Sequence, residues 1–228
     1  MDKVIKYIVG IDEVGRGPIA GPVAVCAFML KYNYELQINN YEFKLSKLKD
    51  SKKLSKKQRE LWFDFLKQQK EKGNCDYIVS FVSSENIDKF GIAKCIQKAL
   101  DTSLSKIAPP EILFERSSEE GGRSARLSQK EILATLHIFL DGGLHAPAEY
   151  INQETIIRGD ELHPVISMAS IVAKVMRDRV MTKYAKQYPE YGFDQHVGYG
   201  TKAHYEVIKK SGLTPIHRRT FIHLTQKD

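Results

Sequence analysis

Three short apolar runs of this sequence each lead into acidic residues with a glycine close by, and these acids are the groups best suited to chemistry. Asp12 and Glu13 follow the first run, Asp141 follows the second, and Asp160 follows the third after Arg158-Gly159. Open α/β sheets place their sites at the ends of strands. The four carboxylates are therefore expected to converge in one pocket.

Converging carboxylates indicate a metal site. Crowded acids repel one another and lose hydration, and divalent cations remove that cost. Oxygen-only ligands favour hard ions, here Mg²⁺ or Mn²⁺. Two such ions roughly 4 Å apart can activate water and stabilise the leaving oxygen in phosphodiester cleavage. The alternative is that each acid only ends a strand or caps a helix, which is commoner for any single Asp-Gly pair.

A glycine-rich turn, Gly15-Arg16-Gly17, comes directly after the first two acids. Because glycine has no Cβ, its backbone amides can approach a ligand closely. One such ligand is a ribose 2′-hydroxyl, the group that distinguishes RNA from DNA. The alternative is an ordinary tight turn.

Other residues could contact nucleic acid. Residues 44–57 hold seven lysines, Lys52 and Lys53 among them, against one acid. These lysines could bind phosphates or form a solvated loop. Tyr199, between two glycines, could stack on a sugar or base, or be a half-buried loop residue. His217-Arg218-Arg219 could bind phosphate or simply lie on the surface.

Strand and helix patterns alternate along the chain, which favours an α/β fold, a sheet flanked by helices. Strands are predicted at residues 5–12, 23–29, 76–82, 137–140 and 155–157. One helix is predicted to begin at Ser55 with a capping box to Gln58, and its apolar face is predicted to be Leu61, Trp62, Phe65 and Leu66. Further helices are predicted over 92–107, stopped by Pro109-Pro110, and over 167–186.

The helix over 167–186 is predicted to bury one stripe and to place its polar residues elsewhere. The stripe consists of Ala169, Val172, Ala173, Met176 and Val180. Lys174, Arg177 and Asp178 fall mainly on other faces. Residues 115–130 are polar, with two central glycines, and are predicted to form a mobile surface insertion. From about residue 185 the chain is richer in helix and loop, which suggests a small C-terminal extension.

The composition is that of an ordinary globular chain of 228 residues with a basic character. Hydrophobic residues make up 42%, charged residues 28%, and the formal net charge is +7. A basic chain tends to meet polyanions, although charge alone fits any basic protein. The three cysteines suit a reducing cytoplasm rather than a disulfide framework, and no signal peptide or membrane span is visible. One domain over residues 1–228, acting as a monomer, is expected.

Five ordered blocks of the sequence resemble the ribonuclease HII family. They span about residues 7–221, and Val197 stands where that family often has lysine. The blocks are residues 11–23, residues 50–55, residues 139–142, residues 159–178, and residues 191–221.

The resemblance implies an RNase H-like fold with a mixed central sheet and a metal-dependent nuclease. It implies that Asp12, Glu13, Asp141 and Asp160 are catalytic residues that bind Mn²⁺ or Mg²⁺. It also implies that Gly15, Arg16 and Gly17 sense the 2′-hydroxyl, and that Tyr199 packs on the following deoxyribose. Lys52, Lys53 and Lys174 would contact phosphate or the site. The implied reaction is cleavage of RNA–DNA hybrids, and 5′ of single ribonucleotides in DNA, giving a 3′-hydroxyl and a 5′-phosphate.

Two alternatives are weighed against this interpretation. Ribonuclease HIII carries an additional N-terminal domain, for which no room is expected because the signature begins near residue 7. A non-catalytic nucleic-acid-binding module could use the same basic surface. Its four acids would repel phosphates unless metal is bound, which disfavours that reading.

Overall fold

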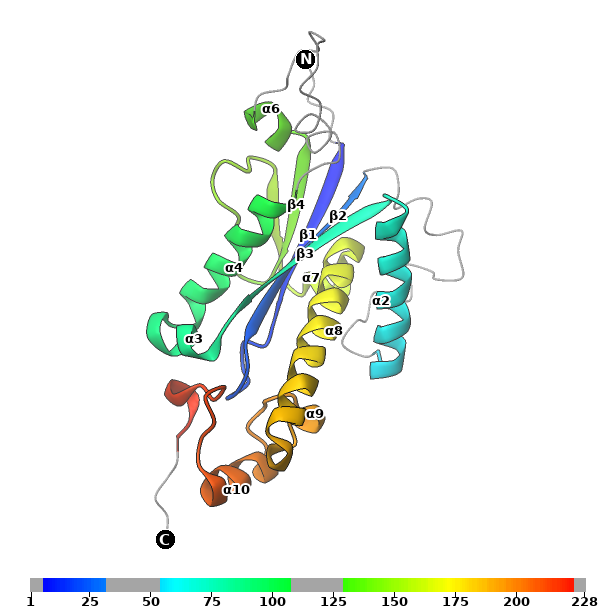
Figure 1. Ribbon diagram of the computed structural model, residues 1–228. Coiled ribbons are helices and arrows are strands. Elements are labelled where there is room, and N and C mark those ends of the chain that lie inside the picture. Colours follow the sequence, from blue (N-terminus) through cyan, green and yellow to red (C-terminus); the bar gives the residue numbers. More distant parts are fainter. Residues whose placement is uncertain (1–5, 32–53, 108–128, 224–228) are drawn as a thin grey trace, which may run out of the picture.

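The computed structural model describes residues 6–31, 54–107 and 129–223, and within them the chain builds a five-stranded mixed sheet (Figure 1). The strand order is β3-β2-β1-β4-β5. β1 pairs antiparallel with β2, and β2 with β3, whereas β4 is parallel to both β1 and β5. The strands are β1 (Tyr7–Val14), β2 (Val23–Lys31), β3 (Cys75–Val82), β4 (Leu136–Asp141) and β5 (Gln153–Ile156).

The two central strands, β1 and β2, are apolar on both faces because helices cover both sides of the sheet. Such continuous apolar runs are typical of strands buried on both sides. Gly10 in β1 shows how closely one helix approaches. A Cβ at this position would lie 2.2 Å from the backbone oxygen of Val165. β1 and the start of the helix behind it are thus packed backbone to backbone.

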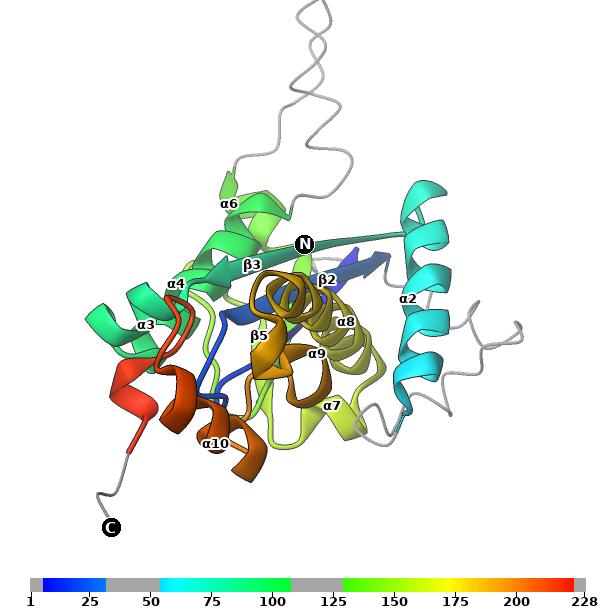
Figure 2. The same cartoon turned by 60° about the horizontal axis from the view of Figure 1, so that its bottom comes forward.

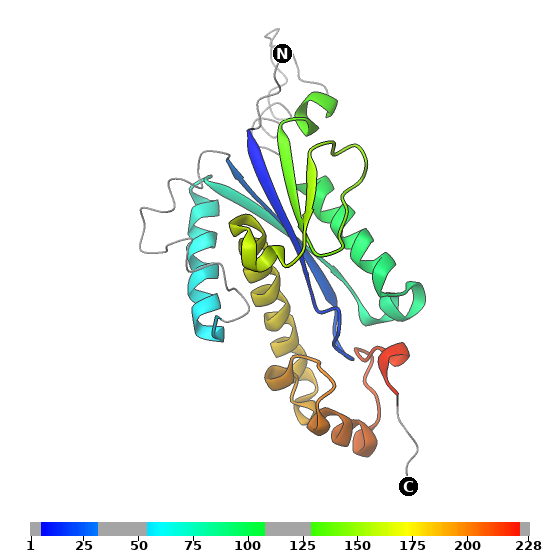
Figure 3. The same cartoon turned by 180° about the vertical axis from the view of Figure 1, so that it is seen from behind.

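Helices α2 (Lys56–Glu71) and α8 (Pro164–Gln187) cover one face of the sheet, and α3 (Ser84–Phe90) and α4 (Ile92–Lys106) lie on the other (Figures 1 and 3). Each face has its own hydrophobic core. Two short helices adjoin the parallel half of the sheet: α6 (Gln129–Leu133) precedes β4, and α7 (Gly159–Leu162) follows β5.

After α8 the chain forms a small helical portion at one end of the sheet, seen from that end in Figure 2. Its elements are η3 (Pro189–Tyr191), α9 (Phe193–His196), α10 (Lys202–Ser211) and η4 (Arg219–Phe221). A third hydrophobic cluster holds this portion against the end of α8 and the loop after β1. The predicted mixed sheet with flanking helices and a helical C-terminal extension is confirmed.

Several local predictions are confirmed and others are wrong. Ser55 caps α2 with the predicted capping box to Gln58. Leu61 was predicted to lie on the buried face of that helix but is 52% exposed, and Phe63 is buried in its place. The strand predicted over residues 155–157 is present as β5, but it ends at Ile156, and Ile157 is 78% exposed.

Helix α8 is buried well beyond its predicted stripe, because the sheet and α2 enclose its first half and the C-terminal portion packs around its second half. Arg177, predicted to lie off the inner face, is fully buried. Helix α4 ends at Lys106, and Pro109-Pro110 lie outside the described residues. So do residues 115–128 of the predicted insertion, while Gln129 and Lys130 begin α6. Among the described helices, none combines the length and the hydropathy that crossing a bilayer requires.

Candidate active site

Three of the four predicted acids meet at one end of the two central parallel strands. Asp12 and Glu13 lie near the end of β1, and Asp141 is the last residue of β4. Since Ile11 is aligned with Leu140 in the parallel register, the next residues, Asp12 and Asp141, come side by side. One carboxylate oxygen from each of the three acids lies within 4.8 Å of the other two.

Asp160 approaches this triplet from a helix rather than from the end of a strand. It lies in α7, and its side chain is fully buried. The backbone N–H of Gly159 donates to Asp141 Oδ1 at 2.6 Å, and the N–H of Asp160 reaches the same oxygen at 3.4 Å. The start of α7 is therefore tied to Asp141, and the charge of Asp160 acts on Asp12.

The electrostatics of the triplet are those of crowded anions. Burial and then Asp141 raise the pKa of Asp12 well above its ordinary value, with Glu13 and Asp160 adding to the effect and a hydrogen bond from Ser170 opposing it. Burial and Asp141 also raise the pKa of Glu13, whereas Arg16, 3.6 Å away, lowers it. A divalent cation would relieve this repulsion, and the all-oxygen donor set fits Mg²⁺ or Mn²⁺.

The triplet opens into a pocket of about 400 Å³ that also contains most of the other predicted site residues. Its walls include Gly15, Arg16, Gly17, Lys174 and Tyr199, as predicted. Tyr199 is 46% exposed, so its ring is available to a ligand. Lys52 and Lys53 lie outside the described residues.

The two glycines of the Gly15-Arg16-Gly17 turn serve different purposes. Gly15 has a φ of +92°, and a Cβ there would lie 2.2 Å from Arg177 Nε, so packing requires glycine at this position. A Cβ on Gly17 would meet only the Tyr199 ring, at 3.8 Å. Gly17 thus leaves open space beside Tyr199 where a ligand can approach the backbone.

Two buried arginines hold this turn and the segment after it from behind. Arg218 Nη2 donates to the carbonyl of Gly15 at 2.7 Å, its Nη1 to that of Arg16 at 3.1 Å, and its Nε to that of Gly21 at 2.9 Å. Because C=O and N–H point in opposite directions across a trans peptide, the N–H groups of Arg16 and Gly17 face away from Arg218.

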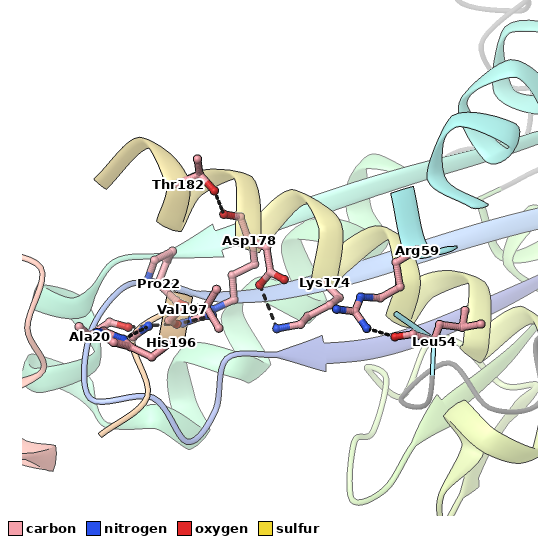
Figure 4. A network of polar contacts seen from close by, with 11 residues as sticks. Ala20, Pro22, Leu54, Arg59, Lys174, Asp178, Thr182, His196 and Val197 are labelled. Atoms are coloured by element: carbon pink, nitrogen blue, oxygen red, sulfur yellow. Dashed lines mark hydrogen bonds and ion pairs between the residues drawn. The ribbon is translucent and has the colours of Figure 1, made fainter. Parts of the chain in front are cut away.

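Arg177, on α8, does the same for the following residues and for the loop before Tyr199. It donates to the carbonyls of Pro22 at 2.9 Å, Val197 at 3.0 Å and Ala20 at 3.4 Å, and these three residues lie together beside α8 in Figure 4. Val197 itself has a φ of 45°, unusual for a β-branched residue. Arg177 therefore joins the turn to the Tyr199 loop.

The expectation that His217-Arg218-Arg219 binds phosphate or lies on the surface is wrong for His217 and for Arg218, which are both buried. Arg218 is fully buried, and its guanidinium donates hydrogen bonds to backbone carbonyls. Neither buried arginine was expected to hold the turn, because the carbonyls between Gly15 and Pro22 that they contact lie more than 150 residues away in the chain. Arg219 is exposed, and its backbone N–H donates to Asp88 at 2.8 Å.

Arg59 is a pocket residue that the sequence patterns did not single out. It lies in the first turn of α2, lines the pocket, and donates to the carbonyl of Leu54. Figure 4 shows it beside Lys174, whose Nζ lies 2.9 Å from Asp178 Oδ1. Only its position just after the helix cap, close to the lysine run, could have drawn attention to it.

In this mixed sheet, clustered carboxylates, a glycine-rich turn and basic side chains border one pocket. This combination is that of a metal-dependent nuclease. The chain belongs to the ribonuclease HII family: the family model described as Ribonuclease HII matches residues 9–224. Proteins of this family are metal-dependent endoribonucleases, and so is this chain.

Known proteins support the same grouping. The chain is 36% identical over 223 residues to the ribonuclease HII of Clostridioides difficile, covering 97% of this chain and 72% of that protein. It is also 36% identical to the ribonuclease HII of Sulfurihydrogenibium sp., covering 95% and 90%. The ribonuclease H2 of Pyrococcus horikoshii shares the fold, with a TM-score of 0.63 at 24% identity over 94% of this chain and 93% of that one.

Proposed function

We propose that this protein hydrolyses the RNA strand of RNA–DNA hybrids and cuts 5′ of single ribonucleotides embedded in duplex DNA. The reaction proceeds by two-metal-ion phosphodiester hydrolysis and leaves a 3′-hydroxyl and a 5′-phosphate. One observation carries the proposal: the acid triplet, the Gly15–Gly17 turn and Tyr199 border a single pocket. Cleavage chemistry and recognition of a ribose can therefore act on one nucleotide.

Asp12, Glu13, Asp141 and Asp160 would hold the cations, Mn²⁺ or Mg²⁺. Bound there, the cations supply Lewis-acid activation of water and stabilisation of the leaving oxygen. The carboxylates themselves keep the site dense in negative charge, so a bare phosphate is repelled until cations are bound. The elements that bear them are braced by the sheet and by the contact of α7 with Asp141.

Recognition of the ribonucleotide would fall to the backbone of Gly15, Arg16 and Gly17. The N–H groups of Arg16 and Gly17, which face away from Arg218, can donate to a 2′-hydroxyl, which deoxyribose lacks. Tyr199, beside Gly17, would pack on the following deoxyribose at an RNA–DNA junction. Lys174 and Arg59, and Lys52 and Lys53 outside the described residues, would contact the phosphates on either side.

The chain would work as one catalytic domain over residues 1–228, with residues 185–228 as its C-terminal portion, and as a monomer. The described cysteines, Cys26, Cys75 and Cys95, are buried and free, which favours a reducing compartment, the cytoplasm. A single sedimenting species of 26.0 kDa would support the monomer, and a species of twice that mass would exclude it.

The decisive experiment is cleavage of a DNA duplex carrying one ribonucleotide, with an all-DNA duplex of the same sequence as control. With Mg²⁺ or Mn²⁺, we expect one cut on the 5′ side of the ribonucleotide and no cut in the control. Mapping the ends should show a 3′-hydroxyl and a 5′-phosphate. Undiminished cutting in EDTA, or binding to the duplex without any cut, would contradict the proposal.

A further inference from the structure

Two buried histidines meet edge to edge behind Tyr199, and the function proposed above makes no use of them. His204, on α10, is fully buried, and His217, before η4, is 2% exposed. Their Nε2 atoms lie 3.0 Å apart. On the far side, His204 Nδ1 lies 2.8 Å from the carbonyl oxygen of Tyr199. The pair therefore forms a bridge that ends on the backbone of a proposed substrate-binding residue.

The hydrogen bonds of this bridge can run in only one direction. The backbone N–H of Thr214 donates to His217 Nδ1 at 2.9 Å, so this nitrogen carries no proton. A neutral His217 then has its proton on Nε2 and donates it to His204 Nε2. His204 in turn has its proton on Nδ1 and donates it to the carbonyl of Tyr199. A backbone N–H, which cannot reverse its role, thus sets the tautomer of both rings.

The bridge requires both rings to be neutral, and their surroundings favour that state. The ring of His196, from α9, stacks on His204 at 4.2 Å, and Tyr191, from η3, lies 5.3 Å from the ring of His217. Burial lowers the pKa of His204 to about 4, with His196 and His217 contributing and the bond to Tyr199 opposing. Burial also lowers the pKa of His217. A second proton on His204 would set its Nε2–H against the Nε2–H of His217 across 3.0 Å, and a second proton on His217 would set its Nδ1–H against the N–H of Thr214 across 2.9 Å.

The same short segment also controls the glycine-rich turn. His217 forms a β-bridge with Ala20, and the next residue, Arg218, donates to the carbonyl of Gly15 at 2.7 Å. The N–H of Arg218 donates to the carbonyl of Ile19 at 2.8 Å. Two consecutive residues therefore reach both parts of the pocket. Arg218 contacts the glycine-rich turn directly, and His217 contacts Tyr199 through His204. The distance between these two parts of the pocket depends on the segment.

We infer that His204 and His217 are positioning residues: a one-directional neutral histidine pair sets the backbone of Tyr199 relative to the Gly15–Gly17 turn. Preference for a ribonucleotide–deoxyribonucleotide junction over a continuous hybrid then depends on a pair that touches no substrate. The inference rests on the proposed role of Tyr199 at that junction.

The first test reads the tautomers of the intact wild-type protein by NMR of ¹⁵N-labelled histidine at neutral pH. We expect the proton on Nδ1 in His204 and on Nε2 in His217, with both rings neutral. A proton on Nε2 in His204, or a charged ring in the pair at neutral pH, would overturn the inference. This measurement needs neither substrate nor a variant that folds.

The second test compares three variants at His204 by kcat/KM on a single-ribonucleotide duplex and on a long hybrid. His204→Phe keeps a ring but removes both hydrogen bonds. We expect an approximately tenfold loss on the single-ribonucleotide duplex, the effect of about one hydrogen bond, and a much smaller loss on the hybrid. His204→Asn keeps a donor at the Nδ1 position and should recover most of the loss. His204→Gln places its amide at the Nε2 position instead, away from the Tyr199 carbonyl, and should not recover the loss.

Tyr199→Ala, alone and combined with His204→Phe, separates this inference from the proposed function. If His204 acts through Tyr199, the double variant should be no worse on the single-ribonucleotide duplex than Tyr199→Ala. If Tyr199→Ala is selective while folded His204→Phe affects both substrates equally, the positioning role is refuted and the proposed function stands. If Tyr199→Ala is not selective, the junction role of Tyr199 fails and the inference with it.

Discussion

At the scale of one residue, Asp12 is a carboxyl group whose surroundings oppose its ionisation. Its side chain is only 4% exposed, and Asp141, Glu13 and Asp160 all raise its pKa. A carboxylate so placed destabilises the protein without metal and binds a cation more strongly for the same reason. Its other contacts, from Ser170 and from the N–H of Glu13 at 2.8 Å, would suit an amide oxygen equally well.

We therefore predict that Asp12→Asn abolishes cleavage and leaves the fold intact. In EDTA the variant should unfold at the same temperature as the wild type or a higher one, since one crowded charge is gone. Mg²⁺ or Mn²⁺ should raise the unfolding temperature of the wild type more than that of the variant, which thermal unfolding followed by circular dichroism will show. Asp76→Asn is the matched control and should keep full activity, because Asp76 lies in β3 and pairs with Lys70 of α2. Turnover at the wild-type rate in Asp12→Asn would exclude the site.

Tyr199 gives a second prediction at this scale, because its ring is half exposed beside Gly17. Tyr199→Ala should reduce kcat/KM on single-ribonucleotide duplexes by about 10- to 100-fold, the range expected for loss of one stacking contact. Tyr199→Phe, which keeps the aromatic face, should stay near the wild-type value. Equal losses on long hybrids would argue against a role at the junction.

At the scale of elements, the Gly15–Gly17 turn is held by contacts between residues far apart in the chain. Arg218 and Arg177 direct their donors at the carbonyls of the segment from Gly15 to Pro22. A loop whose carbonyls are already engaged meets its ligand with its amides in place and loses little entropy on binding. The two arginines therefore make the glycine-rich turn rigid. In the proposed function, a flexible turn would distinguish ribose from deoxyribose less well.

We predict that Arg218→Lys lowers the free energy of unfolding by about 3 kcal/mol, because an ammonium group cannot reach three carbonyls in the geometry of a guanidinium. Urea unfolding will measure the change. The ratio of cutting at a ribonucleotide to cutting at the equivalent deoxyribonucleotide should fall as well. Arg219→Lys, at the exposed next residue, should change neither quantity. A stable Arg218→Lys variant with full discrimination would show that the turn keeps its shape without the arginine.

The histidine pair makes the C-terminal portion sensitive to acid. The pKa of His204 is about 4 in the folded protein, against about 6.5 in an unfolded chain. Unfolded chains therefore take up this proton first as the pH falls. The stability that comes from keeping His204 neutral is fully present above about pH 6.5. The free energy of unfolding then falls by up to about 1.4 kcal/mol per pH unit as the pH drops toward 4.

Urea unfolding of the wild type and of His204→Phe at pH 7, 5.5 and 4.5 should therefore give different slopes. The wild type should lose stability more steeply, since the variant has one fewer buried histidine to protonate. Parallel slopes would show that His204 is protonated as easily in the folded protein as in the unfolded chain.

At the scale of the whole molecule, a chain with a formal net charge of +7 holds a cluster of acids in its pocket. The acids crowd one end of two strands, while Arg59 on α2 and Lys174 on α8 border the same pocket from the helical face. This arrangement suits a polyanion that must be attracted as a whole and admitted to the acids only with cations.

Binding of an uncut duplex should therefore weaken linearly on a log–log plot against salt, measured by fluorescence anisotropy with Asp12→Asn. Replacing Arg59 or Lys174 by Gln should reduce the slope by about one unit each. Lys106→Gln, an exposed residue at the end of α4 on the opposite face of the sheet, should leave it unchanged. An unaltered slope in both pocket variants would remove these residues from phosphate binding.

The sequence by itself determined the elements and the identity of the four acids. The apolar runs that lead into Asp12 and Asp141 mark the sheet edge, because the side-chain pattern of a strand is a local property, whereas Asp160 reaches the site from α7. The capping box at Ser55 was predictable for the same reason. The ordered motifs pointed to the family, which the comparisons confirm.

Only the tertiary structure decided which residues support the site from behind. The sequence did not indicate a supporting role for Arg177, Arg218, His204 or His217, because most of their partners are backbone groups, which carry no sequence signal. Whether a charged side chain is exposed or buried depends on the element that packs over it, as the C-terminal portion does over Arg177. The contacts that support the pocket, from Arg177, Arg218 and His204 to backbone carbonyls, therefore depend on long-range packing, which no local pattern encodes.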